Sequence, residues 1–145
     1  MAEQITVQTM VAAPVAHVWA AYTSPNHITQ WNFAHESWCC PSASVDLQTG
    51  GRYVARMEAR DGSMGFDLEG TIHTVTPGSL FEMTLSDGRK VCTTFLVEGD
   101  RTQVITVFDA ETENSVEMQK DGWQAILDNF RRYVEQPPSH RGAGI

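Results

Sequence analysis

Turn signals in the middle of the chain constrain its fold more than any other feature. From Ala43 to Ala110, glycine-containing pairs recur at intervals of roughly ten residues, a spacing typical of successive hairpins. These pairs stand at 50–51, 61–62, 77–78, 87–88 and 99–100. The segments between them predict strands over 42–47, 52–60, 64–75, 80–86, 90–98 and 101–110. Because tight turns connect most of these strands, we expect an antiparallel sheet.

Apolar and polar residues alternate along these segments, which indicates one buried and one solvated face. In the segment 52–60, for example, Tyr53, Ala55 and Met57 alternate with charged residues. On the next two segments, the side chains predicted to face inward are Met64, Phe66, Leu68, Ile72, Phe81, Met83 and Leu85. The last two segments leave two inward sets open, namely Phe95, Val104 and Phe108 or Leu96, Ile105 and Val107.

The N-terminal part predicts one further strand and two short helices. The segment 4–11 alternates apolar and polar residues, which is typical of a strand. Pro14 then marks the start of a first helix, and Ser24 followed by Pro25 marks the start of a second helix that ends near Trp31.

A long amphipathic helix is predicted over 115–136, with Asn114 as its expected N-cap. Such a helix is about 33 Å long, and a nine-residue strand is roughly 30 Å long, so the helix and the sheet match in length. The sequence therefore predicts an α+β fold, in which a seven-stranded curved antiparallel sheet wraps around the C-terminal helix.

Length and composition exclude several classes of protein. The 145 residues fit one domain over 1–136, followed by a mobile proline- and glycine-containing tail over 137–145. A net charge of −8 disfavours nucleic acid and anionic membranes as partners. The chain also lacks a signal-peptide pattern and an apolar run long enough to span a bilayer. We therefore expect a cytoplasmic protein.

No motif in the sequence indicates a metal, a cofactor or a catalytic centre. His35, Cys39, Cys40 and Cys92 could be counted as four zinc ligands, but adjacent cysteines do not have the spacing of paired ligands. The signatures of serine hydrolases, zinc proteases, nucleotide-binding loops and dinucleotide-binding folds do not occur. The sequence thus predicts no metal site, no cofactor and no catalytic residue.

Several short segments, in order along the chain, resemble the activator of Hsp90 ATPase homologue family of the START-like (SRPBCC) superfamily. They are 13–23, Trp31, the Asp-Leu-x-x-Gly-Gly turn over 45–51, Phe66 with Gly70, Glu111, and 122–130, although Gln48 stands where the family commonly has Arg. The resemblance implies the helix-grip fold and a cavity between helix and sheet, which in this superfamily has been adapted to lipid transport, hormone binding and polyketide cyclisation. Fold alone does not fix function.

The resemblance leads us to expect a hydrophobic ligand, lipid-like or polyketide-like, between the sheet and the last helix. The candidate ligand-binding residues are Trp19, Tyr53, Met57, Met64, Phe66, Phe81, Met83, Thr93, Phe95, Trp123, Leu127 and Phe130. A cavity and a packed core give the same pattern of residues, so a solid core stays an alternative. A cyclase or hydrolase using the same cavity, a chaperone-interaction module and a homodimer are also left open. Gly122 suggests a close backbone approach or a kink in the last helix.

Overall fold

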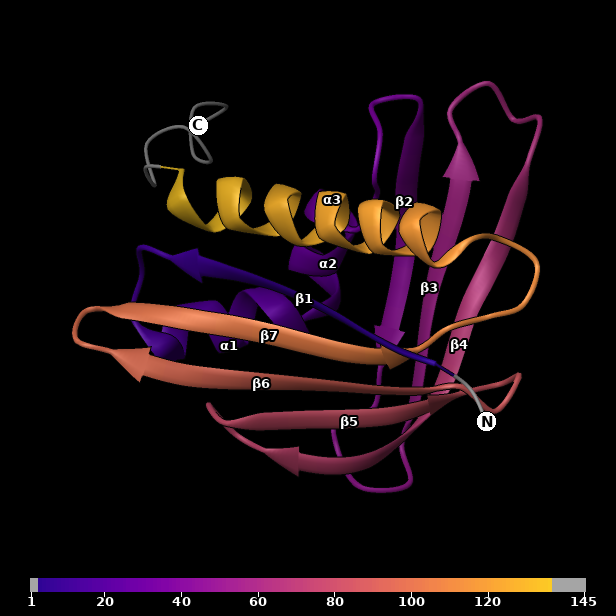
Figure 1. Ribbon diagram of the computed structural model, residues 1–145. Coiled ribbons are helices and arrows are strands. Elements are labelled where there is room, and N and C mark those ends of the chain that lie inside the picture. Colours follow the sequence, from indigo (N-terminus) through magenta and orange to yellow (C-terminus); the bar gives the residue numbers. More distant parts are fainter. Residues whose placement is uncertain (1–2, 137–145) are drawn as a thin grey trace.

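The computed structural model describes residues 3–136, and its sheet has the predicted number of strands and the predicted antiparallel pairing (Figure 1). The elements in chain order are β1 (Gln4–Val11), α1 (Val15–Thr23), α2 (Pro25–Trp31), β2 (Trp38–Val45), β3 (Arg52–Ala59), β4 (Gly65–Thr76), β5 (Leu80–Leu85), β6 (Lys90–Glu98), β7 (Arg101–Asp109) and α3 (Val116–Glu135). The strand order is β1-β7-β6-β5-β4-β3-β2. The predicted tail over 137–145 lies outside the described residues.

The sheet curls because β4 takes part in two different halves of it. The first part of β4 pairs with β3 and its last part pairs with β5, and the two pairings overlap at Gly70 and Thr71. A register shift between Ile72 and Thr74 follows within the pairing with β5. Such a bulge bends a strand and increases its twist. In Figure 1, β2 and β3 accordingly run at a steep angle to β1, β7 and β6, and α3 runs alongside β1 and passes across β2.

Three glycines lie at close contacts near this bend. A Cβ atom on Gly70 would lie 2.9 Å from the Thr84 carbonyl oxygen, so β4 and β5 could not approach as they do. The turn over 46–51 folds back onto β4, where Gly50 N–H donates to the Ile72 carbonyl (2.7 Å) and Ile72 N–H donates to the Gly51 carbonyl (2.8 Å). The Gly-Gly turn is therefore hydrogen-bonded to β4 directly beside the register shift.

The long helix α3 covers the concave side of the sheet and is hydrogen-bonded to the edge strand β1. The Gln124 amide donates to the Gln8 carbonyl (3.0 Å) and accepts from Gln8 N–H (3.3 Å), so the free edge of β1 is paired with a side chain. On the other side, Asn129 Nδ2 donates to the Trp31 carbonyl (3.0 Å) and connects α3 with α2. These contacts fix α3 over the sheet.

An aromatic cluster fills the part of the interior beneath α1 and α2. The ring of Tyr22 stacks on Trp31 and makes edge contacts with the rings of Phe81, Phe95 and Phe130, with centroid separations of 5.4–6.2 Å. Side chains from both short helices, the sheet and α3 thus meet at one residue.

The structure shows which side chains of β6 and β7 face the interior, and it corrects several expectations. Phe95, Val104 and Phe108 are buried, so Leu96, Ile105 and Val107 face outward. Strand β2 begins at Trp38 rather than at residue 42, because an edge strand with a register shift between Cys39 and Ser42 tolerates Pro41.

Three further expectations about local structure are wrong. Met64 precedes β4 and is 64% exposed, because the turn over 61–63 carries the chain away from the inner face. Ser115, not Asn114, caps α3, its Oγ accepting from Met118 N–H (3.1 Å), while Asn114 Nδ2 donates to Glu111. Of the two roles expected for Gly122, the close backbone approach is wrong, because a Cβ at this position would meet no atom within 4 Å; the kink stays a prediction.

Candidate functional site

A cavity of about 200 Å³ lies between the concave face of the sheet and the three helices. The sheet contributes residues from β1, β3, β4, β6, β5 and β7, and the helices contribute residues from α1, α2 and α3. Its lining residues are Val7, Tyr22, Trp31, Asn32, Tyr53, Met57, Phe66, Leu68, Met83, Arg89, Val91, Thr106, Trp123, Ile126 and Leu127. Most of these side chains are apolar, so the cavity offers a largely dry surface to a small molecule.

Half of the candidate residues chosen from the sequence line this cavity. They are Tyr53, Met57, Phe66, Met83, Trp123 and Leu127. Phe66 is 51% exposed and its ring lies near that of Trp38, so it forms part of the rim. Trp123 stacks on Phe108 at a centroid separation of 3.9 Å, which holds its indole against the wall.

The other candidate residues do not line the cavity. Phe81, Phe95 and Phe130 are buried in the aromatic cluster around Tyr22, and Trp19 packs edge-on against Phe95. Thr93 is also fully buried, and Met64 is exposed. Inward orientation was predicted correctly for the sheet residues of the cluster, but the helices that cover this half of the sheet fill the space there.

The sequence reasoning missed polar residues of the cavity, above all Asn32, Arg89 and Thr106. Asn32 follows the last residue of α2, and Arg89 lies in the turn between β5 and β6. Neither belongs to a periodic segment, so no alternation of apolar and polar residues could place them. The one signal for Asn32 is its position directly after Trp31, which the helix pattern turns inward.

One group of hydroxyls at the cavity is internally satisfied. The Tyr22 hydroxyl and Thr93 Oγ1 are 3.1 Å apart, and Thr93 Oγ1 and Thr106 Oγ1 are 3.0 Å apart. Burial raises the pKa of Tyr22, and the hydrogen bond to Thr93 partly offsets this effect. These three side chains therefore need no ligand to satisfy them.

The polar groups of Tyr53 and Asn32 differ from these hydroxyls because they lack hydrogen-bond partners among the described residues. Their side chains are 6% and 5% exposed, both line the cavity, and neither makes a side-chain hydrogen bond with another residue in the range 3–136. Every fully enclosed side-chain nitrogen or oxygen in that range has a partner, so the polar atoms of Tyr53 and Asn32 face accessible space. Burial also raises the pKa of Tyr53, so its hydroxyl stays protonated at neutral pH.

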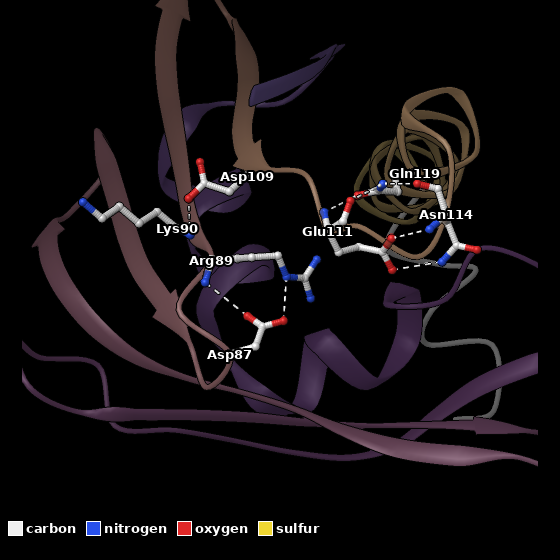
Figure 2. Close-up of polar contacts among 7 residues, drawn as sticks. All are labelled: Asp87, Arg89, Lys90, Asp109, Glu111, Asn114 and Gln119. Atoms are coloured by element: carbon white, nitrogen blue, oxygen red, sulfur yellow. Dashed lines mark hydrogen bonds and ion pairs between the residues drawn. The ribbon is translucent and has the colours of Figure 1, made fainter. Parts of the chain in front are cut away.

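Among residues 3–136, Arg89 is the one charged residue of the cavity lining. Its Nε donates to Asp87 Oδ2 (2.7 Å), and its backbone N–H donates to Asp87 Oδ1 (3.1 Å). Figure 2 shows the side chain extending from the β5–β6 turn towards the connection that carries Glu111. The positive charge of Arg89 helps to lower the pKa of Glu111, so two carboxylates compensate this guanidinium.

The connection between β7 and α3 is a tightly bonded loop beside Arg89 (Figure 2). Glu111 accepts from the backbone N–H of Asn114 (2.6 Å) and from its amide (2.9 Å), and these bonds lower the pKa of Glu111 more than Arg89 does. The buried Gln119 side chain accepts from Glu111 N–H and donates to the carbonyls of Glu111 and Asn114. Glu111 thus stabilises the connection that leads into α3.

The described residues hold no group of three or more His, Cys, Asp or Glu side chains arranged to bind a metal ion. Cys39, Cys40 and Cys92 are free thiols. Over the range 3–136, no helix has the length and apolar character needed to cross a membrane.

The curled antiparallel sheet, the two short helices after its first strand and the C-terminal helix define the helix-grip class of START-like folds, which commonly bind hydrophobic ligands. The family model for Activator of Hsp90 ATPase homolog 1-like protein matches residues 12–135, and the chain belongs to this family.

Solved structures support the assignment. An AHSA1-like protein from Aeromonas hydrophila is 38% identical, with a TM-score of 0.86 over 98% of this chain and 94% of that chain. Chr148 from Cytophaga hutchinsonii is 42% identical, with a TM-score of 0.80 over 91% of this chain and 92% of that chain. CV1439 from Chromobacterium violaceum, at 20% identity and a TM-score of 0.81 over 93% and 99% of the two chains, shows the fold alone. No curated protein matches this chain.

Proposed function

We propose that this protein binds a small hydrophobic molecule in the cavity between the sheet and α3. The observation that carries the proposal is a space of about 200 Å³ whose wall is mostly aromatic and aliphatic. An engineered apolar cavity of about 150 Å³ stays dry and binds benzene. The cavity of this protein is larger, so a substituted benzene or a short acyl chain has room in it.

The chemistry of the wall favours binding over catalysis. General acid–base catalysis needs a group that changes its protonation state near the working pH. The Tyr53 hydroxyl keeps its proton because burial raises its pKa, and the Tyr22 hydroxyl is held by Thr93. Arg89 is paired with Asp87. These groups suit the orientation of a bound ligand rather than a chemical reaction with it.

A matched pair of tryptophan substitutions tests the proposal. Leu68 lines the cavity and is only half-buried, whereas Leu96 lies on the opposite, outward face of the sheet. Ethylbenzene, added to the ¹⁵N-labelled protein and followed by NMR, is expected to shift the amide signals of the cavity residues. Leu68→Trp should weaken this binding by at least about tenfold (~1.4 kcal/mol), because the indole occupies the space.

Leu96→Trp adds the same side chain outside the cavity and should leave the affinity unchanged. Circular dichroism establishes that both variants are folded. If ethylbenzene does not bind the unmodified protein, or if both variants bind it equally well, the cavity is not a ligand site.

A further inference from the structure

The cavity holds two polar side chains that the protein itself does not satisfy. The side chains of Asn32 and Tyr53 are more than nine-tenths buried, have no hydrogen-bond partner in the described part of the chain, and line the same space. They come from different parts of the fold, the end of α2 and the strand β3. Because their polar atoms face the accessible space of the cavity, both side chains are open to a hydrogen-bonding group that enters it.

Packing alone gives no reason for either polar group. A leucine at position 32 or a phenylalanine at position 53 would present nearly the same shape to the cavity without an unpaired polar atom. The neighbouring hydroxyls of Tyr22, Thr93 and Thr106 show that this interior can satisfy polar groups with one another. The unpaired groups are therefore best explained by a partner that enters from outside.

We propose that the ligand is an uncharged molecule with an apolar body and a carbonyl or hydroxyl oxygen, which accepts hydrogen bonds from the Tyr53 hydroxyl and the Asn32 amide. This inference rests on the function proposed above and adds the polar chemistry of the ligand. A carbonyl oxygen has two lone pairs and can accept from both donors. Tyr53 acts as a donor because its hydroxyl stays protonated at neutral pH.

The charges around the cavity favour an uncharged ligand over a carboxylate. Arg89 is the one charged residue of the lining, and its Nε is already bonded to Asp87, with Glu111 nearby. Asn32 and Tyr53 provide dipoles but no positive charge. A carboxylate placed against them would lose part of its hydration beside a guanidinium whose charge two carboxylates already compensate, which is unfavourable.

Three probes of nearly equal size test this inference on the full chain. α-Methylstyrene carries a C=CH₂ group where acetophenone carries C=O, and benzoate carries a carboxylate on the same ring. Their dissociation constants are measured by NMR titration with the unmodified protein and with Tyr53→Phe and Asn32→Leu. Tyr133→Phe is the control, because the Tyr133 hydroxyl is 2.6 Å from His27 Nδ1 and Tyr133 does not line the cavity.

Tyr53→Phe and Asn32→Leu should each weaken acetophenone binding by about fivefold, the effect of one hydrogen bond, and should not weaken α-methylstyrene binding. Tyr133→Phe should leave both affinities unchanged. If the two cavity variants affect acetophenone and α-methylstyrene alike, the polar subsite is wrong while the proposed function stands. Benzoate binding more tightly than acetophenone would overturn the choice of an uncharged ligand. If none of the three probes binds, the proposed function fails as well.

Discussion

Removing the hydroxyl of Tyr22 should destabilise the protein, whereas removing the hydroxyl of Tyr53 should not. Tyr22 and Tyr53 both line the cavity, and in both cases Tyr→Phe deletes one oxygen atom from a ring packed among aromatic neighbours. The change in apolar burial is therefore nearly the same. What differs is the hydrogen bonding of the deleted oxygen, which makes the two variants a matched pair.

The magnitude follows from the contacts of each hydroxyl. The Tyr22 hydroxyl lies 3.1 Å from Thr93 Oγ1, and Thr93 keeps a second partner in Thr106 when this bond is lost. Tyr22→Phe should therefore lower the free energy of unfolding by about 1 kcal/mol. Tyr53→Phe removes a hydroxyl that faces the cavity and has no partner within the described residues, so it should leave the free energy of unfolding unchanged or raise it by up to about 1 kcal/mol.

Urea unfolding of the ligand-free protein, followed by circular dichroism and tryptophan fluorescence, measures both effects. Coincident transitions and equal m-values justify a two-state comparison of the variants. In a domain of this size, 1 kcal/mol corresponds to roughly 3–4 °C in Tm, which gives a second readout. If Tyr53→Phe destabilises the protein as much as Tyr22→Phe does, the Tyr53 hydroxyl has a partner and the polar subsite loses its basis.

Three other perturbations follow from the structure. Gly122→Ala should raise the free energy of unfolding by up to about 1 kcal/mol in urea titrations, because the added methyl group meets no atom within 4 Å and alanine favours the helix; a loss of stability would show a hidden contact. Folding lowers the pKa of Glu111 from its usual 4.5, so its contribution to stability is present above pH 4.5 and is lost as the pH falls through the pKa of the folded state. The difference in stability between the unmodified protein and Glu111→Gln should therefore shrink between pH 5 and pH 3 in urea titrations, and a difference independent of pH would contradict this reading. Burial raises the pKa of Cys40 to about 11, so iodoacetamide at pH 7.5 should label Cys40 only after unfolding, as peptide mass spectrometry can determine; rapid native labelling would place this thiol at the surface.

The sheet and the long helix could be predicted because their signals are local and repeated. Glycine turns separate the strands, alternation identifies their inner faces, and the apolar stripe of α3 runs along the whole helix. The errors occur where a local signal conflicts with its surroundings. The strand expected over 42–47 begins at Trp38, because β2 is an edge strand and accommodates Pro41 in an irregularity.

The site was harder to predict than the fold. The alternation of apolar and polar residues along a strand shows which side chains face inward, but it does not show which residues of the helices they contact. Met57 and Phe95 both face inward, yet Met57 lines the cavity and Phe95 packs in the cluster beneath α1. Which of these environments an inward residue meets depends on the helix that covers it, and nothing in the strand itself specifies that. The rim residue Phe66 is an inward position that the edge of the cavity leaves half-exposed.

The polar residues of the cavity indicate which chemical groups a ligand should carry, whereas the apolar residues indicate mainly its size. An apolar wall selects ligands mainly by size, since one methylene more or less changes affinity only modestly. An unpaired donor selects by chemistry, because a ligand that cannot accept its hydrogen bond leaves it unsatisfied. Local rules of packing are most often broken at functional sites, and Asn32 and Tyr53 break them in the same cavity. Relatives of this chain that share the fold and carry apolar residues at these two positions should therefore bind hydrocarbons as well as this protein does, but should not discriminate acetophenone from α-methylstyrene.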